Sequence, residues 1–231
     1  MKKKLWWMLP LAAVLILLLW LAESWFGILP KPRYTAEDFN IQTVKSTVDF
    51  DADGIEDYAD LLAGAKADAK NRPRYHSAYY QGGYPPENEG VCTDLVWRAF
   101  KEAGYSLREM VDADVRKRPE AYPHIEKPDA NIDFRRVTNL HIFFEHYAKA
   151  QTTDIDAIAE WQAGDIVIFG RDKHIGIVSD RRNAKGQPYI LHNGGQFQRE
   201  EDYLPRASVT AHYRFDASAL PFEEAIAFKK S

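Results

Sequence analysis

Cysteine is nearly absent from this sequence, because Cys92 is the single one among 231 residues. A lone cysteine excludes an internal disulfide. Internal repeats and low-complexity tracts are absent as well, which excludes a repeat architecture. The thiol of Cys92 is therefore either a small buried apolar group or a reactive one, and its neighbours must decide between the two.

Clusters of basic residues are missing from position 30 onward, where 27 Lys and Arg stand against 33 Asp and Glu, a net charge of −6. Without a basic patch, nucleic-acid binding is excluded as a leading function. The composition is 13% aromatic and 28% charged, as in a globular protein. The roughly 200 residues that follow the first 30 suffice for one domain with a sizeable core.

The first 30 residues differ from the rest in composition. Three lysines at positions 2–4 precede an uncharged apolar run from Leu5 to Ala22. A helix of that length can cross a bilayer core of roughly 30 Å, with the lysines on the cytoplasmic side. We therefore expect residues 1–30 to be a single-pass transmembrane signal anchor, with the remainder of the chain outside the cytoplasm. A cleaved signal peptide is the alternative, although no clean small-x-small site follows the run.

Residues 31–48 read as a polar linker, with one short strand near 42–48, and residues 49–231 as the domain. Apolar spacing predicts helices first and an antiparallel meander after them, which is the α+β class. The expected helices cover residues 55–70, 92–103, 107–116 and 140–150. The expected strands cover residues 165–169, 174–179, 188–192 and 209–215.

Cys92 follows a glycine-containing loop and opens a predicted helix. The free N–H groups and partial positive charge of a helix N-terminus stabilise a thiolate and lower the thiol pKa. The same N–H groups could hold an oxyanion. The carboxylate of Asp94 would raise the thiol pKa if it lay near the sulfur, so we expect the Asp94 side chain to point away from Cys92.

His174 opens a predicted strand, where a rigid backbone can hold an imidazole as the base for a thiol. His192 ends the next strand, and a hairpin would bring the two rings together across the ladder. His192 is therefore favoured as the group that orients the base. Asn193 is the competing candidate, and the two side chains should point to opposite faces of the sheet.

Several of these residues form an ordered pattern that resembles the NlpC-like, papain-related superfamily of bacterial cell-wall cysteine peptidases and amidases. The pattern, which resembles an uncharacterised family within that superfamily, spans roughly residues 50–215. It comprises Tyr79-Tyr80, Gly90-Val91-Cys92-Thr93-Asp94, Asp133 to Val137, Trp161, Gly164 to Phe169, His174 to Val178 and His192 to Gly195.

The resemblance implies a papain-like core, with a helix-borne cysteine packed on a small antiparallel sheet. It implies Cys92 as nucleophile, His174 as base and His192 as the third residue, without a catalytic cofactor. It also implies that Tyr80 or Tyr84, in the loop before the cysteine, lines a substrate site together with Asn193. The pair Gly164-Asp165 is expected to be structural, as the turn that starts a strand.

An acidic loop matches the spacing of oxygen ligands in an EF-hand-type calcium loop, with Gly54 at its sixth position. The ligands would be Asp49, Asp51, Asp53, Ile55 through its carbonyl, Asp57 and Asp60. The last position is not the usual Glu, and no clear helix precedes the loop. A structural calcium ion is one interpretation, and an acidic N-terminal cap for the helix at 55–70 is the other.

The leading hypothesis is hydrolysis of peptidoglycan amide bonds through an acyl-enzyme on Cys92. One alternative is a zinc site made of Cys92, His174 and His192. The other is a non-catalytic cell-wall binding module that uses the same cleft. The sequence does not select the scissile bond.

Overall fold

The computed structural model describes residues 5–26, 33–220 and 224–229, which belong to two compact units, residues 1–32 and 33–231. The first unit contains one helix, α1 (Leu5–Phe26), with Pro10 inside it. Among the residues described, none of the helices is long and apolar enough to cross a membrane. Residues 1–4 and 27–30 of the predicted anchor lie outside the described residues, so membrane anchoring stays a prediction.

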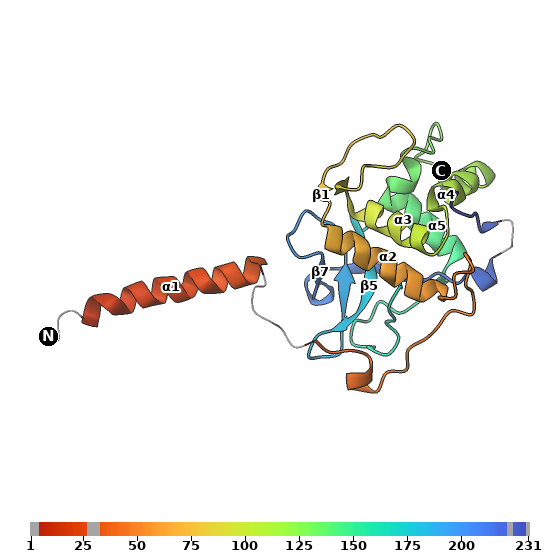
Figure 1. Cartoon of the computed structure of the whole chain (residues 1–231). Helices are drawn as coiled ribbons and strands as arrows, with labels where there is room; N and C mark the ends of the chain where they lie inside the picture. Colours follow the sequence, from red (N-terminus) through yellow and green to blue (C-terminus); the bar gives the residue numbers. More distant parts are fainter. Residues whose placement is uncertain (1–4, 27–32, 221–223, 230–231) are drawn as a thin grey trace. The chain divides into compact units, whose positions relative to one another are not determined.

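Over its described residues, 33–220 and 224–229, the second unit combines four α-helices with short 3-10 turns and eight strands (Figure 1). The helices are α2 (Asp57–Asn71), α3 (Cys92–Glu102), α4 (Leu107–Lys117) and α5 (Val137–Tyr147). The turns are η2 (Glu37–Phe39), η3 (Pro119–Ala121), η4 (Asp133–Arg135), η5 (Leu204–Arg206) and η6 (Ala217–Ala219). The strands are β1 (Arg74–Tyr75), β2 (Glu89–Gly90), β3 (Lys149–Ala150), β4 (Ile166–Phe169), β5 (His174–Arg182), β6 (Pro188–Leu191), β7 (Glu200–Glu201) and β8 (Val209–Arg214).

Six strands form one antiparallel sheet in the order β3-β8-β4-β5-β6-β7, and β1 pairs with β2 in a separate parallel ladder. The predicted α+β class with a small antiparallel sheet is confirmed. Strands β4 to β6 follow one another as a meander, as predicted, and β7, which was not predicted, continues it. The last strand does not extend the meander, because β8 returns to the free edge of β4.

The sheet is covered on both faces. On one face, α2 and α3 lie side by side and pack against β5 (Figure 1). Their fully buried side chains meet alternate residues of the sheet in one core that includes Leu61, Leu95, Phe100, Ile175 and Ile177. A smaller core on the other face contains Trp161, Val167, Phe169, Val178, Ile190 and Leu204. The two-residue period of a strand sends neighbouring side chains into different cores.

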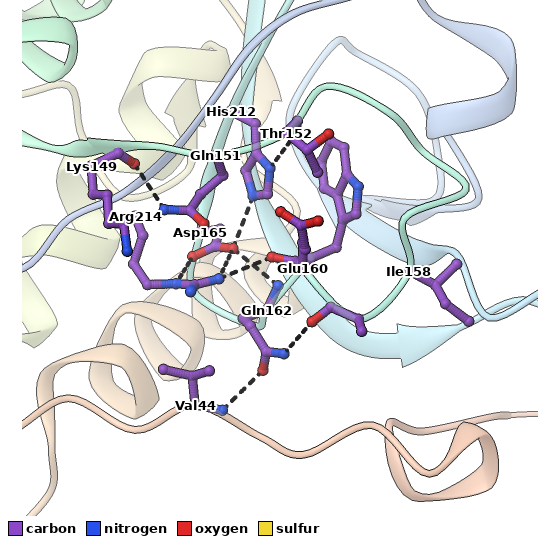
Figure 2. A network of polar contacts seen from close by, with 12 residues as sticks. Val44, Lys149, Gln151, Thr152, Ile158, Glu160, Gln162, Asp165, His212 and Arg214 are labelled. Atoms are coloured by element: carbon purple, nitrogen blue, oxygen red, sulfur yellow. Dashed lines mark hydrogen bonds and ion pairs between the residues drawn. The ribbon is translucent and has the colours of Figure 1, made fainter.

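A buried polar network fixes the turn before β4 (Figure 2). The Asp165 carboxylate accepts hydrogen bonds from His212 Nε2 at 2.9 Å, Arg214 Nε at 2.7 Å and the Gln162 backbone N–H at 3.0 Å. The side-chain oxygen of Gln162 accepts from the backbone N–H of Val44 at 3.0 Å. Asp165 is therefore occupied as a structural acceptor that joins β4 to β8.

Residues 33–48, predicted as a linker, lie against the domain. Tyr34 bridges to Arg182, and Ile41 is buried. No strand forms between residues 42 and 48, which the structure describes in full. The backbone there bonds to side chains such as Gln162 and Glu56 instead, which a search for alternating apolar residues does not detect.

We predict that Gly176→Ala destabilises the hairpin of β5 and β6. A Cβ atom at this position would lie 2.7 Å from Ile190 Cγ2 and 2.8 Å from the Leu191 carbonyl oxygen. Such overpacking costs about 1–3 kcal/mol, which chemical denaturation would measure. In the control Gly194→Ala, the added atom would lie 3.3 Å from the flexible end of Gln196 and at ordinary contact distances of 3.6 Å from His174 and 4.0 Å from His192. An equal loss of stability in both variants would contradict this explanation.

Candidate active site

Cys92 is the first residue of α3 and is buried. Burial raises the pKa of its thiol to about 11, although the backbone N–H groups of Ile175 and Thr93 act in the opposite direction. The predicted effect of the helix N-terminus is therefore present, but the loss of hydration outweighs it. The expectation of a lowered pKa is wrong, and the resting sulfur is a protonated thiol.

The sulfur meets the sheet at the beginning of β5, because the N–H of Ile175 faces it. His174 is the residue immediately before Ile175 and the first residue of β5. Within the described part of the chain, no hydrogen bond joins the Cys92 sulfur to His174 or His192. Catalytic hydrogen bonds are often loose without substrate and tighten when it binds.

The hairpin brings the two predicted histidines together, as expected. His174 Nε2 and His192 Nδ1 are 2.8 Å apart, and the rings are nearly perpendicular. Asn193 points to the other face, where its side-chain N–H groups donate to the carbonyl oxygens of Gly90 and Pro73. The geometry therefore brings His192, and not Asn193, to the candidate base.

The His174 ring is partly buried beside Phe169 and Tyr203. Burial and the neighbouring charge of His192 lower the pKa of His174 to about 4. The imidazole is therefore neutral at pH 7 and able to accept a proton. Its Nδ1 atom has no hydrogen-bond partner among the residues that the structure describes, while Nε2 is engaged with His192.

A fourth member of the cluster, Glu201, escaped the sequence analysis. Its carboxylate lies 3.2 Å from His192 Nε2 and 3.2 Å from Arg206. Burial opposes its ionisation, but the hydrogen bond with His192 and the guanidinium of Arg206 outweigh burial and lower the pKa of Glu201. Strand β7 is only two residues long, so no alternation of apolar residues could have identified it.

The N-terminus of α3 is held by a buried ion pair. The Asp94 carboxylate accepts from Arg135 Nε at 2.7 Å, from Trp97 Nε1 at 2.9 Å and from the Val91 backbone N–H at 2.8 Å. Asp94 contributes to the raised pKa of Cys92, yet the guanidinium of Arg135 offsets its charge. Arg135 also donates to the carbonyl oxygen of Ala78, so the pair ties the loop before Cys92 to the helix.

The two predicted substrate tyrosines have other contacts. Tyr80 donates a hydrogen bond to Glu89 at 2.7 Å and lies over Arg135. Tyr84 packs among the rings of Trp97, Phe134 and Phe228 in the helical layer.

Two other tyrosines, Tyr75 and Tyr203, lie close enough to Cys92 for the sulfur charge to raise their pKa, after the larger effect of burial. Tyr75 is half exposed. Their positions in β1 and just after β7 depend on the pairing of two-residue strands, which no pattern of apolar residues indicates.

The two predicted metal sites, the acidic loop and the set of Cys92, His174 and His192, differ in how closely their ligand atoms gather. Within the described ranges, the one group of metal-binding side chains whose ligand atoms gather closely is Asp49, Asp51 and Asp53. The set Cys92, His174 and His192 does not gather in this way, and the two rings are hydrogen-bonded to each other. The zinc alternative therefore has no support from this arrangement.

The acidic loop is only partly assembled. The three exposed carboxylates lie within 4.8 Å of one another, but Asp57 is turned toward Tyr105 and the N–H of Phe50. Asp60 is buried and outside that group. Ile55 donates its N–H to Asp53, while Glu56 caps helix α2. Structural calcium stays a prediction.

Comparison with known proteins places these residues in a family. A family model described as "Domain of unknown function (DUF1287)" matches residues 62–215. The "Uncharacterized protein YijF" of Escherichia coli (strain K12) is 38% identical over 149 residues, which is 62% of this chain and 72% of that protein. No solved structure matches. The matched description names neither an NlpC-like nor a papain-like protein, so that resemblance rests on the residues alone.

We predict that alkylation of Cys92 by iodoacetamide accelerates steadily between pH 7 and pH 10. A thiol of pKa about 11 gains thiolate throughout that interval, roughly tenfold per pH unit. The denatured chain is the control, because its thiol should approach a plateau above its ordinary pKa of about 8.5. A plateau between pH 5 and pH 8 in the folded chain would reveal a preformed thiolate and contradict the neutral resting state.

We predict that Arg135→Met destabilises the protein by about 3–5 kcal/mol, because it leaves the Asp94 carboxylate buried without its cation. Guanidinium unfolding measures the change. The neighbouring Arg136 is exposed, so Arg136→Met should change stability by less than about 0.5 kcal/mol. Adding Asp94→Asn to Arg135→Met should recover part of the loss, and no recovery would argue against the unpaired charge as its cause.

Proposed function

The chain belongs to the DUF1287 family, and we propose that it is a cysteine hydrolase that cleaves amide bonds in peptidoglycan peptides. Cys92 acts as the nucleophile, His174 as the base and His192 as the group that orients the base. The NlpC-like, papain-related resemblance supports the same assignment.

One observation carries the proposal. A buried thiol at a helix N-terminus faces the backbone N–H of Ile175 in β5, and the residue before Ile175 is His174, a neutral imidazole that a second histidine engages through one nitrogen only. A structural cysteine needs neither a neighbouring base nor an orienting group. The three residues come from α3, β5 and the end of β6, so it takes the whole fold to bring the thiol to the strand that carries His174 and to bring His192 to His174.

The chemistry follows a general-base route, because both partners are neutral at rest. His174 Nδ1 takes the thiol proton as the sulfur attacks the carbonyl carbon of the substrate. The imidazolium then gives this proton to the departing amine as the carbon–nitrogen bond breaks. Water, deprotonated by the same ring, hydrolyses the thioester and restores the thiol.

The backbone at the start of α3 supplies the oxyanion site. The N–H groups of Cys92 and Thr93 lie near the sulfur and oppose the rise in its pKa. Helix-terminal N–H groups have no partner within the helix. They could donate to the oxygen that becomes negative in the tetrahedral intermediate.

The substrate class rests on the resemblance and on the predicted location. Residues 1–30 would hold the domain on the periplasmic side of an inner membrane, where peptidoglycan peptides are the abundant amide substrates. No cofactor is needed for this chemistry. A binding module that uses the same cleft would need neither the thiol nor the base.

We predict that the full chain releases peptides from purified sacculi, detected by mass spectrometry. Cys92→Ala and His174→Ala should each lower this release at least about 10³-fold, because nucleophile and base act as one unit. The exposed His146 of α5 provides the matched control, and His146→Ala should leave the rate unchanged.

Each result bears on a different part of the proposal. Full product release by Cys92→Ala would end the hydrolase assignment. Retention of the wild-type chain on sacculi without any product would favour the binding module instead. Cleavage of other amides, with sacculi left intact, would retain the reaction and replace the substrate.

A further inference from the structure

A chain of hydrogen bonds extends from the candidate base to a carboxylate that the proposed triad does not contain. His174 Nε2 contacts His192 Nδ1 at 2.8 Å, and His192 Nε2 lies 3.2 Å from Glu201 Oε2. His192 and Glu201 lie on the same side of the sheet as Ile190. Ile190 is the pairing partner of Glu201 and stands two residues before His192, so the three side chains point the same way.

We propose that Glu201 is a positioning residue that fixes the tautomer of His174 through His192. This inference rests on the proposed function, since it assigns the proton arrangement of the same base.

The direction of the bonds follows from what each group can donate. An ionised carboxylate only accepts, so His192 must carry its proton on Nε2, next to Glu201. In a neutral ring the other nitrogen, Nδ1, is then an acceptor. His174 must therefore donate from Nε2, which leaves the lone pair on its Nδ1 free to take the thiol proton.

Removing the carboxylate would release this constraint. Without an acceptor at Nε2, His192 could protonate Nδ1 and donate to His174 Nε2. The proton of His174 would then move to Nδ1, the nitrogen that must be bare for base catalysis. A wrong tautomer is far more damaging to a histidine base than a small displacement.

Within the part of the chain that the structure describes, the contacts of His192 include no anion other than Glu201. Its backbone N–H donates to the Arg199 carbonyl oxygen, and the Gln196 amide nitrogen lies 3.2 Å from its Nδ1 and 3.3 Å from its Nε2. The Tyr203 ring packs against it. Glu201 is held in turn by Arg206, which is largely exposed.

The neighbouring Glu200 offers a matched control. It sits on the same two-residue strand, but it faces the other side, where its carboxylate accepts from the Ser179 hydroxyl at 2.5 Å. A change there perturbs β7 to a similar degree without touching either histidine.

The experiment reads the tautomer directly, with the full chain labelled with ¹⁵N at histidine and no substrate present. In the wild type, the ¹⁵N shifts should show His174 protonated at Nε2 and bare at Nδ1. Glu201→Ala should convert His174 to a mixture of tautomers, whereas Glu200→Gln should match the wild type. Glu201→Gln should restore the wild-type state, because its amide oxygen still accepts from His192.

Kinetics add a second readout once a substrate is known. Glu201→Ala should lower kcat about 10–100-fold, the usual effect of losing a group that orients a functional histidine, with little change in KM. Arg206→Gln keeps the carboxylate and removes its other partner, so it should retain more than half of the wild-type kcat.

Three outcomes would overturn the inference: His174 protonated at Nδ1 in the wild type, an unchanged tautomer in Glu201→Ala, or an equal loss of kcat in Arg206→Gln. The first is read without any variant, so it decides the question even if Glu201→Ala does not fold. Because the tautomer is measured without substrate, the absence of hydrolase activity would not be mistaken for failure of this arrangement.

Discussion

The buried ion pair between Asp94 and Arg135 determines where the cysteine lies. Asp94 is one turn into α3, and its carboxylate also accepts from the N–H of Val91, the residue before Cys92. Arg135 links this end of the helix to the loop at Ala78. The packing of apolar side chains alone allows a helix to rotate about its axis and to slide along it. The Asp94–Arg135 pair restricts both movements at the end of α3 that carries Cys92.

The same placement has an electrostatic consequence. The helix end that positions Cys92 against β5 also removes the thiol from water, so its pKa rises even though backbone N–H groups face it. His174 undergoes the corresponding change, since burial disfavours its charged form. Thiol and imidazole are thus both neutral, and a proton transfer between them would accompany attack on a substrate.

The sheet holds its structural and candidate functional polar groups at different ends, since Asp165 precedes β4 and His174 pairs with Phe169 at the end of β4. Asp165, His212 and Arg214 satisfy one another in a closed network that joins β4 to β8 (Figure 2). The contacts of His174, His192 and Glu201 leave one nitrogen, Nδ1 of His174, without a partner in the described part of the chain. An incomplete set of hydrogen bonds, on a strand whose next residue faces a buried thiol, is what distinguishes this site from the structural network.

The sequence by itself determined the α+β class, the four helices α2 to α5, the strands β4, β5, β6 and β8, and the hairpin that joins His174 to His192, because these depend on apolar periodicity and short-range turns. It could not place Glu201, Tyr203 or Arg135, which reach the site through pairing of two-residue strands or across 41 residues of chain. The sequence also could not show whether the pKa of the Cys92 thiol is raised or lowered. A helix N-terminus is visible in a sequence, whereas the burial that outweighs it exists only once distant segments pack together.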